Sequence, residues 1–213
     1  MHSRTRLFPF LVFLAIAAMA QDTPPAEARF TARDAHQGVT IAARPLADVA
    51  EAETLFGKDA APARAGLLAM EMLVVNEREA PITINLGRIA LLRNGDKFQQ
   101  IPPAEAALRL YPLPEGRQPN LGPQPLPLPR RSPLPKDKKR GDREEAEAAL
   151  ASRRFRTRSI PAGGQARGFL YFDLGEVGAN LAGMQLYIPN VDDAATGEGL
   201  LYFEIALAPA RDP

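Results

Sequence analysis

The sequence predicts a mainly β protein built as an antiparallel β-sandwich. Roughly seven or eight short segments alternate apolar and polar residues, which is the pattern of strands that bury one face. Asn94-Gly95 lies between two of these segments, and both residues tolerate the positive φ of a type I′ hairpin turn. Because strands do not alternate with helices along the chain, a parallel α/β sheet is not expected.

The strands are expected in two groups, separated by a long insertion. The run GLLAMEMLVVN at residues 66–76 is apolar and ends in β-branched residues, which predicts a central strand. A short strand is expected before it, at residues 39–43. After it come PITINL, with strict alternation, and a hairpin that pairs residues 88–93 with 97–101. The later strands are expected within residues 159–174, 183–189 and 200–207.

Two short helices are also expected. Pro45 suits the first turn of a helix at residues 46–56, whose apolar side chains share one face before a glycine ends it. A second helix is expected at residues 142–154, because Asp142 and Glu145 have the spacing of a capping box. Its acidic residues lie near the start and its arginines near the end, which matches the helix dipole.

The first twenty residues, MHSRTRLFPFLVFLAIAAMA, have the features of a secretory signal peptide. Arg4 and Arg6 precede a short apolar run, and Ala18 and Ala20 have the spacing that a signal peptidase requires. We therefore expect residues 1–20 to be removed, which leaves an exported, periplasmic or extracellular protein without a transmembrane anchor. An uncleaved N-terminal anchor is the alternative.

The rest of the chain is expected to form one interrupted domain. A flexible, polar leader at residues 21–37 would precede a single β-sandwich domain at residues 38–208 and a tail at residues 209–213. The domain is interrupted at residues 102–157 by a proline-rich, basic and helical insertion. Eleven of the chain's 21 prolines lie in the first part of this insertion, where their alternation favours an extended polyproline II conformation.

Positive charge is concentrated later in the insertion. Residues 130–158 hold eleven Lys or Arg against five Asp or Glu, which is a local excess of six, although the whole chain has a net charge of +1. No aromatic residue lies among the first of these basic residues, so base stacking and nucleic-acid binding are not expected. An anionic envelope polymer or lipid head groups could bind there, and a solvated insertion without a function is the alternative. The candidate polyanion contacts are Arg130, Arg131, Lys136, Lys138, Lys139 and Arg140.

Three tyrosines form a candidate binding face. By strand alternation, Tyr171, Tyr187 and Tyr202 lie beside polar residues and are expected on one exposed sheet face. Such a face could stack sugars or hold a partner peptide. Tyrosines on a half-buried sheet are also ordinary packing residues, so both interpretations stay open.

The residue inventory argues against most catalytic chemistries. The chain has no cysteine, so disulfides, zinc–thiolate sites and thiol nucleophiles are excluded. His36 is the one histidine after the signal peptide and is expected to be solvated; no G-x-S-x-G motif supports a serine triad. Glu71, Asp173 and Glu204 lie on different expected strands and could serve a carboxylate-dependent hydrolase, although each also fits an outward-facing position.

One acidic loop is a candidate calcium site. Asp192, Asp193 and Glu198 lie close together in the sequence, and their carboxylates are suitable Ca²⁺ ligands. The loop lacks the D-x-D-x-D-G spacing of a calcium-binding loop. We therefore expect a solvated loop, with no metal and no cofactor.

The order of these motifs resembles a known family. A V-N pair with a charged turn, P-I-T-I, a hairpin at N-G and I-P-A-G-G-x-x-R-G-F-L-Y-F-D-L are similar to exported bacterial immunoglobulin-like domains, across residues 66–101 and 158–207. The resemblance implies an immunoglobulin-like sandwich and an exported setting, and it brings no catalytic residue.

The functional expectation is an exported, non-enzymatic binding or accessory module of the cell envelope. Its partner would be an envelope protein or an anionic polymer. Two alternatives stay open: an electrostatic adhesion module that binds anionic envelope polymer through the basic insertion, and the carboxylate-dependent hydrolase.

Overall fold

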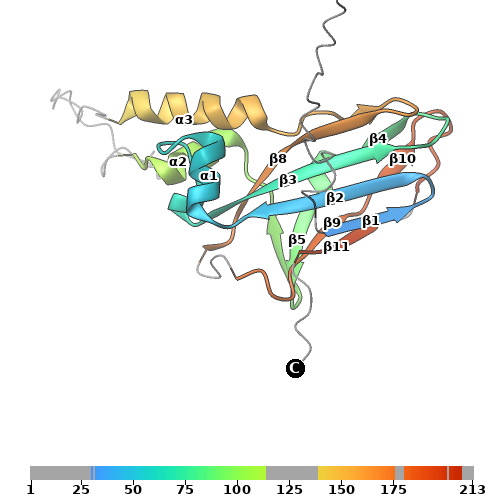
Figure 1. Cartoon of the computed structure of the whole chain (residues 1–213), viewed down its shortest axis with the longest axis horizontal. Coiled ribbons are helices and arrows are strands. Elements are labelled where there is room, and N and C mark those ends of the chain that lie inside the picture. The colour runs from blue at the N-terminus through green and yellow to red at the C-terminus, as the bar shows by residue number, and fades with distance from the viewer. Residues whose placement is uncertain (1–29, 31, 114–138, 176–179, 201, 208–213) are drawn as a thin grey trace, which may run out of the picture.

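The computed structural model describes residues 30, 32–113, 139–175, 180–200 and 202–207. This part of the chain is mainly β, with three antiparallel sheets and three short α-helices (Figure 1). The expected signal peptide, the tail and most of the proline-rich tract lie outside the described residues. No helix within the described ranges is long and apolar enough to span a membrane.

Sheet A contains the predicted central strand. It has the order β1-β2-β3-β8, and every neighbouring pair is antiparallel. β3 lies between two partners, as its continuous apolar run predicts. The strands are β1 Ala32–His36, β2 Val39–Leu46, β3 Leu67–Asn76 and β8 Gln165–Asp173.

The first strand of sheet A corrects the expected leader, which was assigned as flexible up to Gln37. Residues 32–36 instead pair with residues 39–43 across a tight turn in which Gln37 and Gly38 both have positive φ. The sequence ARDAH has no large apolar residue, so its alternation was too weak to predict a strand.

The other two sheets are shorter. Sheet B has the order β10-β4-β7 and sheet C the order β11-β9-β5-β6. The predicted hairpin is confirmed between β5 and β6, where Asn94 has φ 50° and Gly95 has φ 92°. The strands are β4 Ile82–Ile84, β5 Ala90–Arg93, β6 Asp96–Gln99, β7 Ser159–Ile160, β9 Gln185–Ile188, β10 Val191–Asp193 and β11 Phe203–Ala206.

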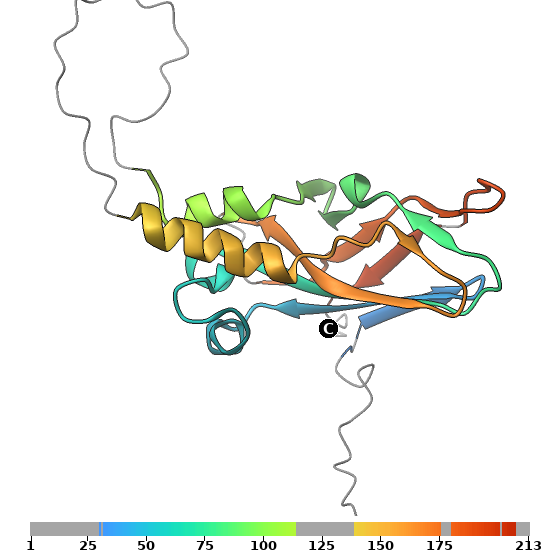
Figure 2. The ribbon, with the colours of Figure 1, turned by 90° about the horizontal axis from the view of Figure 1, so that it is seen from above.

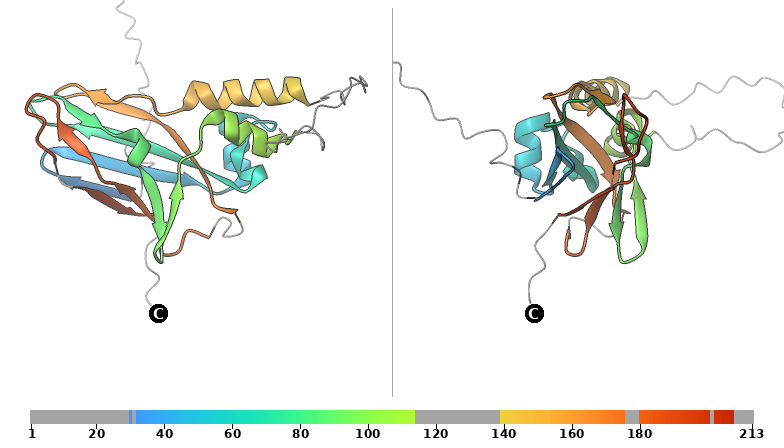
Figure 3. Two further views of the ribbon diagram at one scale, coloured as in Figure 1. Left: turned by 180° about the vertical axis from the view of Figure 1, so that it is seen from behind. Right: turned by 90° about the vertical axis from the view of Figure 1, so that its right-hand side faces the viewer.

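One apolar core joins the three sheets. Met70 and Leu170 come from sheet A, Ile82 from sheet B, and Leu186 and Ile205 from sheet C, and each is at most 1% exposed. Sheet A therefore faces sheets B and C across a shared interior (Figure 3). Burial of this apolar area is the main stabilising contribution in a chain without disulfides.

A second apolar cluster lies on the outer face of sheet A, at the end that the helices cover. Figure 2 shows the three helices gathered at that end. Phe56, Ala107 and Leu150 from the three helices pack against Phe169 and Tyr171 of β8. The helices are α1 Val49–Phe56, α2 Pro103–Leu110 and α3 Arg140–Arg153.

The helix boundaries differ from those expected. β2 continues through Leu46, so Pro45 lies in a strand, and α1 begins only after Asp48, whose side chain accepts the N–H of Glu51 at 2.8 Å. α3 begins at Arg140, before Asp142, so the predicted capping box is wrong.

The third helix, α2, lies in the first part of the expected proline-rich insertion and was not predicted. It begins with Pro103 at its first position, where proline suits a helix because the missing N–H would have no helical partner. The many neighbouring prolines concealed this eight-residue helix in the sequence.

Candidate functional site

Two connecting segments lie against the outer edge of strand β8. Residues 99–102 lead from β6 to α2, and residues 154–158 lead from α3 to β7. The Ile101 N–H donates to the carbonyl of Tyr171 at 2.9 Å, and the Phe155 N–H donates to the carbonyl of Phe169 at 2.9 Å. Since these two carbonyls point to the same side of the strand, both segments lie at one edge.

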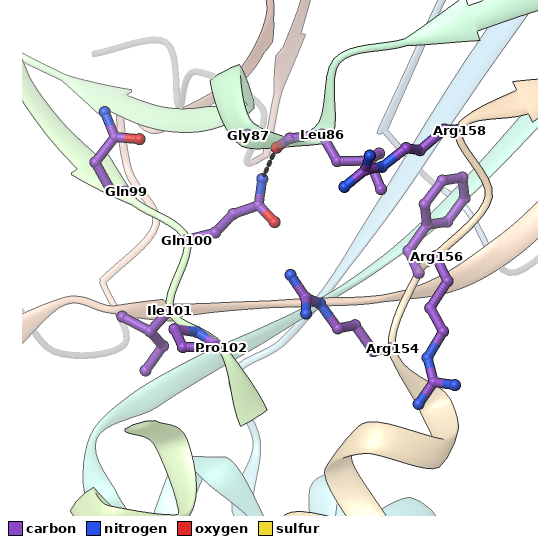
Figure 4. Close-up of a pocket in the computed structure, with 10 residues that line it drawn as sticks. Leu86, Gly87, Gln99, Gln100, Ile101, Pro102, Arg154, Arg156 and Arg158 are labelled. Atoms are coloured by element: carbon purple, nitrogen blue, oxygen red, sulfur yellow. Dashed lines mark hydrogen bonds between the residues drawn. The ribbon is translucent and has the colours of Figure 1, made fainter. Parts of the chain in front are cut away.

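A pocket of about 310 Å³ lies between these segments (Figure 4). The turn at Leu86-Gly87 forms its third wall. The side-chain amide of Gln100 donates to the carbonyl of Leu86, and to that of Ile89 at 3.3 Å, so it holds the turn against the 99–102 segment. The walls of the pocket are therefore fixed by hydrogen bonds to backbone groups.

The 154–158 segment is anchored on both sides. The Phe155 side chain is 1% exposed and packs in the core, and the Arg158 carbonyl accepts the N–H of Ile84 at 2.8 Å. Gly168 permits this close approach, because a Cβ there would lie 2.5 Å from the Cα of Phe155. Extended backbone with Phe155 turned inward leaves the alternate residues Arg154, Arg156 and Arg158 exposed.

Arg154 and Arg158 point into the pocket, whereas Arg156 points toward α3 (Figure 4). Arg156 donates to the carbonyl of Ala151 in the last turn of that helix. Within the described ranges, no carboxylate lines the pocket or forms an ion pair with Arg154 or Arg158. The pocket thus has a local excess of positive charge.

Two guanidinium groups at one pocket suit an anionic ligand. Each presents N–H donors in a planar fork that matches a carboxylate or phosphate, and neither can act as an acceptor. Leu86 and Ile101 also line the pocket, beside the polar residues Gln99 and Gln100. Arg154 and Arg158 are exposed, so an anion can reach both guanidinium groups from solvent.

The predicted basic contacts lie elsewhere in the chain. Arg130, Arg131, Lys136 and Lys138 fall outside the described residues, so that prediction is not tested. Lys139 and Arg140 lie at the start of α3, where Arg140 pairs with Glu144 at 2.8 Å.

Arg154 and Arg158 were both counted in the basic stretch, and Arg154 was assigned to the end of a predicted helix. The alternation in R-F-R-T-R at residues 154–158 was the sequence signal for an extended segment with arginines on one side.

The predicted three-tyrosine face is wrong. Tyr171 is 1% exposed beneath α3 and its hydroxyl donates to the Leu150 carbonyl at 2.8 Å. Desolvation raises the pKa of Tyr171 well above its usual value. Tyr187 and Tyr202 do lie together, with ring centroids 5.9 Å apart. Tyr171 differs because its strand belongs to sheet A, where the helices cover the outer face.

The three predicted carboxylates do not form one site. Glu71 is 2% exposed and is held by Arg44 and Arg167, while Asp173 pairs with Arg109 at 3.0 Å. Glu71 and Asp173 are offset by four residues along paired strands, which is about 13 Å. Glu204 lies in sheet C. This separation is too large for the paired carboxylates of a glycosidase.

The acidic loop, which was expected to be solvated and was considered as a calcium site, is organised around one aspartate. Asp193 accepts a hydrogen bond from Arg78 at 2.8 Å and backbone N–H bonds from Ala195 and Thr196 at 2.8 and 3.1 Å. The Arg78 bond, followed by these backbone bonds, holds the pKa of Asp193 below its usual value. Across the described residues, no three His, Cys, Asp or Glu side chains gather to hold a metal.

His36 is less solvated than expected. It lies in β1 with its ring stacked on Phe203, at a centroid distance of 4.0 Å, and its Nδ1 is 3.3 Å from Asp34. The Asp34 carboxylate also accepts the N–H of Glu204 at 3.2 Å. These contacts join the edges of sheets A and C, so His36 has a packing role there.

Comparisons with known proteins give little information about this chain. No family model and no curated protein matches it. One solved structure, described as a functionally unknown protein from Listeria monocytogenes EGD-e, is similar at 10% identity with a TM-score of 0.35. That match covers 84% of this chain and 82% of the other. A TM-score at this level supports no argument about fold or function.

Proposed function

We propose that this chain is an exported, non-enzymatic accessory module of the cell envelope that binds an anionic ligand. The site is the pocket between residues 99–102 and 154–158. The observation behind the proposal is that Arg154 and Arg158 face this pocket with no carboxylate partner among the described residues. An anion would supply the missing negative charge.

The setting of the module is inferred from sequence. Residues 1–20 have the basic, apolar and small-residue regions of a signal peptide, and the absence of cysteine is compatible with any redox compartment. We include an immunoglobulin-like fold in the proposal. Its support is the antiparallel pairing of all three sheets around one core.

The expected binding energy comes from charge-assisted hydrogen bonds. A hydrogen bond to a charged group contributes about 1.5–3 kcal/mol, and guanidinium forks can form two such bonds with one carboxylate or phosphate. Both arginines are solvent-accessible, so salt screens part of the attraction. The affinity should therefore fall as ionic strength rises.

The test measures binding of residues 21–213 to polyphosphate and to a hyaluronan oligosaccharide at low salt. The double variant Arg154→Gln/Arg158→Gln should lose about tenfold or more in affinity for both, which corresponds to about 1.4 kcal/mol or more. The control Arg33→Gln/Arg64→Gln removes the same charge from β1 and from the turn before β3, and it should bind almost normally.

Two results would contradict the proposal. One is normal binding by the pocket variant, and the other is an equal loss in the control, which would show that only net charge matters. Export is tested separately, because N-terminal sequencing of the secreted or periplasmic protein should begin at Gln21.

A further inference from the structure

The outer face of sheet C extends from the arginine pocket. Gln99 lines the pocket and pairs with Ala90, which pairs in turn with Tyr187, and Tyr187 pairs with Glu204. These residues share the outer face, because their neighbours Phe98, Leu91, Leu186 and Ile205 all face the core. Gln99 and Tyr187 are two strand spacings apart, which is about 10 Å.

An aromatic pair, exposed Tyr202 and half-buried Tyr187, lies at the far end of this row. Tyr202 is 53% exposed, more than any other large apolar side chain that the structure describes, and its ring lies 5.9 Å from that of Tyr187. Tyrosine offers an apolar ring face and a polar hydroxyl, which suits a ligand with both kinds of surface. Sugar rings have such surfaces, with C–H groups on one face and hydroxyls around the edge.

Polar side chains surround the aromatic pair. Gln185 and Glu204 are exposed on the same outer face, and Gln99 stands at the rim of the pocket. Their amide and carboxylate groups can hydrogen-bond sugar hydroxyls. Ala90, between Gln99 and Tyr187, is fully buried, so other groups cover the middle of the row and a ligand would contact its two ends.

Charge varies along the row. Arg154 and Arg158 are at one end, and Glu204 is exposed beside Tyr187 at the other. A ligand with negative charge on every unit would be repelled by Glu204. A glycan in which acidic and neutral sugars alternate can place a carboxylate at the arginines and a neutral ring at the tyrosines.

We infer that the ligand is an acidic polysaccharide, bound across sheet C with a sugar carboxylate at Arg154 and Arg158 and a neutral sugar on Tyr187 and Tyr202. This inference rests on the proposed function, because it uses the same arginine pocket. It adds the chemical class of the ligand and a second contact surface. A simple polyanion would use the arginines alone.

The experiment compares a hyaluronan oligosaccharide, in which acidic and neutral sugars alternate, with polyphosphate, which has no sugar. Tyr202→Ala should weaken hyaluronan binding about fivefold to tenfold and leave polyphosphate binding unchanged. Tyr202→Phe keeps the ring and should bind hyaluronan within about twofold of the original chain. Val49→Ala is the matched control. It also shortens an exposed apolar side chain, but Val49 lies in α1 and not in sheet C.

A spectroscopic readout accompanies the affinities. The chain has four tyrosines and no tryptophan, so its intrinsic fluorescence comes from tyrosine. Hyaluronan should change this emission in the original chain and much less in Tyr202→Ala, while polyphosphate should change it in neither. An equal thermal midpoint for the original chain and Tyr202→Ala would show that the variant is folded.

The outcomes separate the two proposals. If Tyr202→Ala binds hyaluronan normally while the arginine variant loses polyphosphate, the polysaccharide inference is overturned and the anion site stands. If Tyr202→Ala weakens both ligands equally, the tyrosines do not recognise sugar and the inference also fails. If the arginine variant binds both ligands normally, both proposals fail.

Discussion

Two groups of arginines in this protein have opposite surroundings. On the outer face of sheet A, Arg44 and Arg167 flank Glu71, with Nε–Oε distances of 2.8 and 2.6 Å. At the pocket beside β8, Arg154 and Arg158 have no carboxylate partner in the part of the chain that the structure describes. Each group holds two arginines, and Arg167 is exposed like the pocket pair, so number and exposure do not fully separate the groups. The difference is whether the fold supplies a negative charge.

These surroundings indicate which arginines stabilise the fold and which are available to a ligand. Strand register places Arg44 directly opposite Glu71, and Arg167 diagonally across from it on the next strand. The pocket arginines come from a connecting segment beside the neutral residues of 99–102 and the Leu86-Gly87 turn. We expect substitutions in the first group to affect folding, and substitutions in the second to affect binding.

The largest expected effect is loss of a partner of Glu71. Arg44→Met should lower the free energy of unfolding by about 3 kcal/mol, because a carboxylate that is 2% exposed keeps only one of its two cations. Urea denaturation measures this change. In Arg44→Met/Glu71→Leu much of the loss should be recovered, since the buried charge is removed as well. A double variant less stable than Arg44→Met would contradict this account of the cluster.

The next largest effect is expected at Gly168, which positions the pocket segment. In Gly168→Ala the new Cβ meets the backbone of Phe155 at 2.5 to 2.7 Å, so the unfolding free energy should fall by about 2 kcal/mol. Polyphosphate affinity should fall too, because Arg154 and Arg158 move with the segment. Gly141→Ala in α3 meets nothing within 4 Å and should be neutral or stabilising. Equal stability of the two alanine variants would show that the segment adapts.

A smaller, pH-dependent effect is expected at the ion pair of Arg78 and Asp193. The folded pKa of Asp193 is depressed, so its contribution is present above the unfolded pKa of about 3.9 and is lost as the pH falls through the folded value. Asp193→Asn should therefore unfold at lower urea than the original chain at neutral pH. In acid the two midpoints should converge. A difference that stays constant across the titration would show that the charge of Asp193 is not involved.

The smallest effect on stability is expected at the pocket arginines. Arg154→Gln/Arg158→Gln should change the unfolding free energy by no more than about 0.5 kcal/mol, because no described ion pair is broken. Removing two nearby positive charges can even stabilise the chain slightly at low salt. Thermal unfolding measures this change. A loss similar to that of Arg44→Met would place these arginines with the structural group.

Local patterns predicted many of the elements. The apolar run before Asn76 gave a central strand, the Asn94-Gly95 pair gave a hairpin, and the alanine-rich segment gave most of α3. Each depends on neighbours in sequence, through side-chain alternation, turn geometry or helix propensity. Elements with weak patterns were missed, such as β1, which has small apolar residues, and α2, which lies among prolines.

The candidate site could be predicted only in part. The excess of arginine and the outward position of Tyr202 were predicted from the sequence. Which arginines and which tyrosines lie together was not predicted. Tyr171 and Tyr187 have similar alternating neighbours, yet one lies under helices and the other on an open sheet. Alternation shows which residues share a face of one strand. It does not show what packs against that face.

The sequence by itself determined the mainly β character, the hairpin, the helical end of the insertion and the absence of cysteine chemistry. These depend on composition and on contacts between near neighbours. Only the tertiary structure decided that residues 99–102 and 154–158 lie on one edge of β8. It also decided that Glu71 forms ion pairs with Arg44 and Arg167, whereas Arg154 and Arg158 face a pocket. Whether an arginine meets a carboxylate depends on strand register, and the pocket forms between segments more than fifty residues apart in the sequence. No local pattern specifies either arrangement.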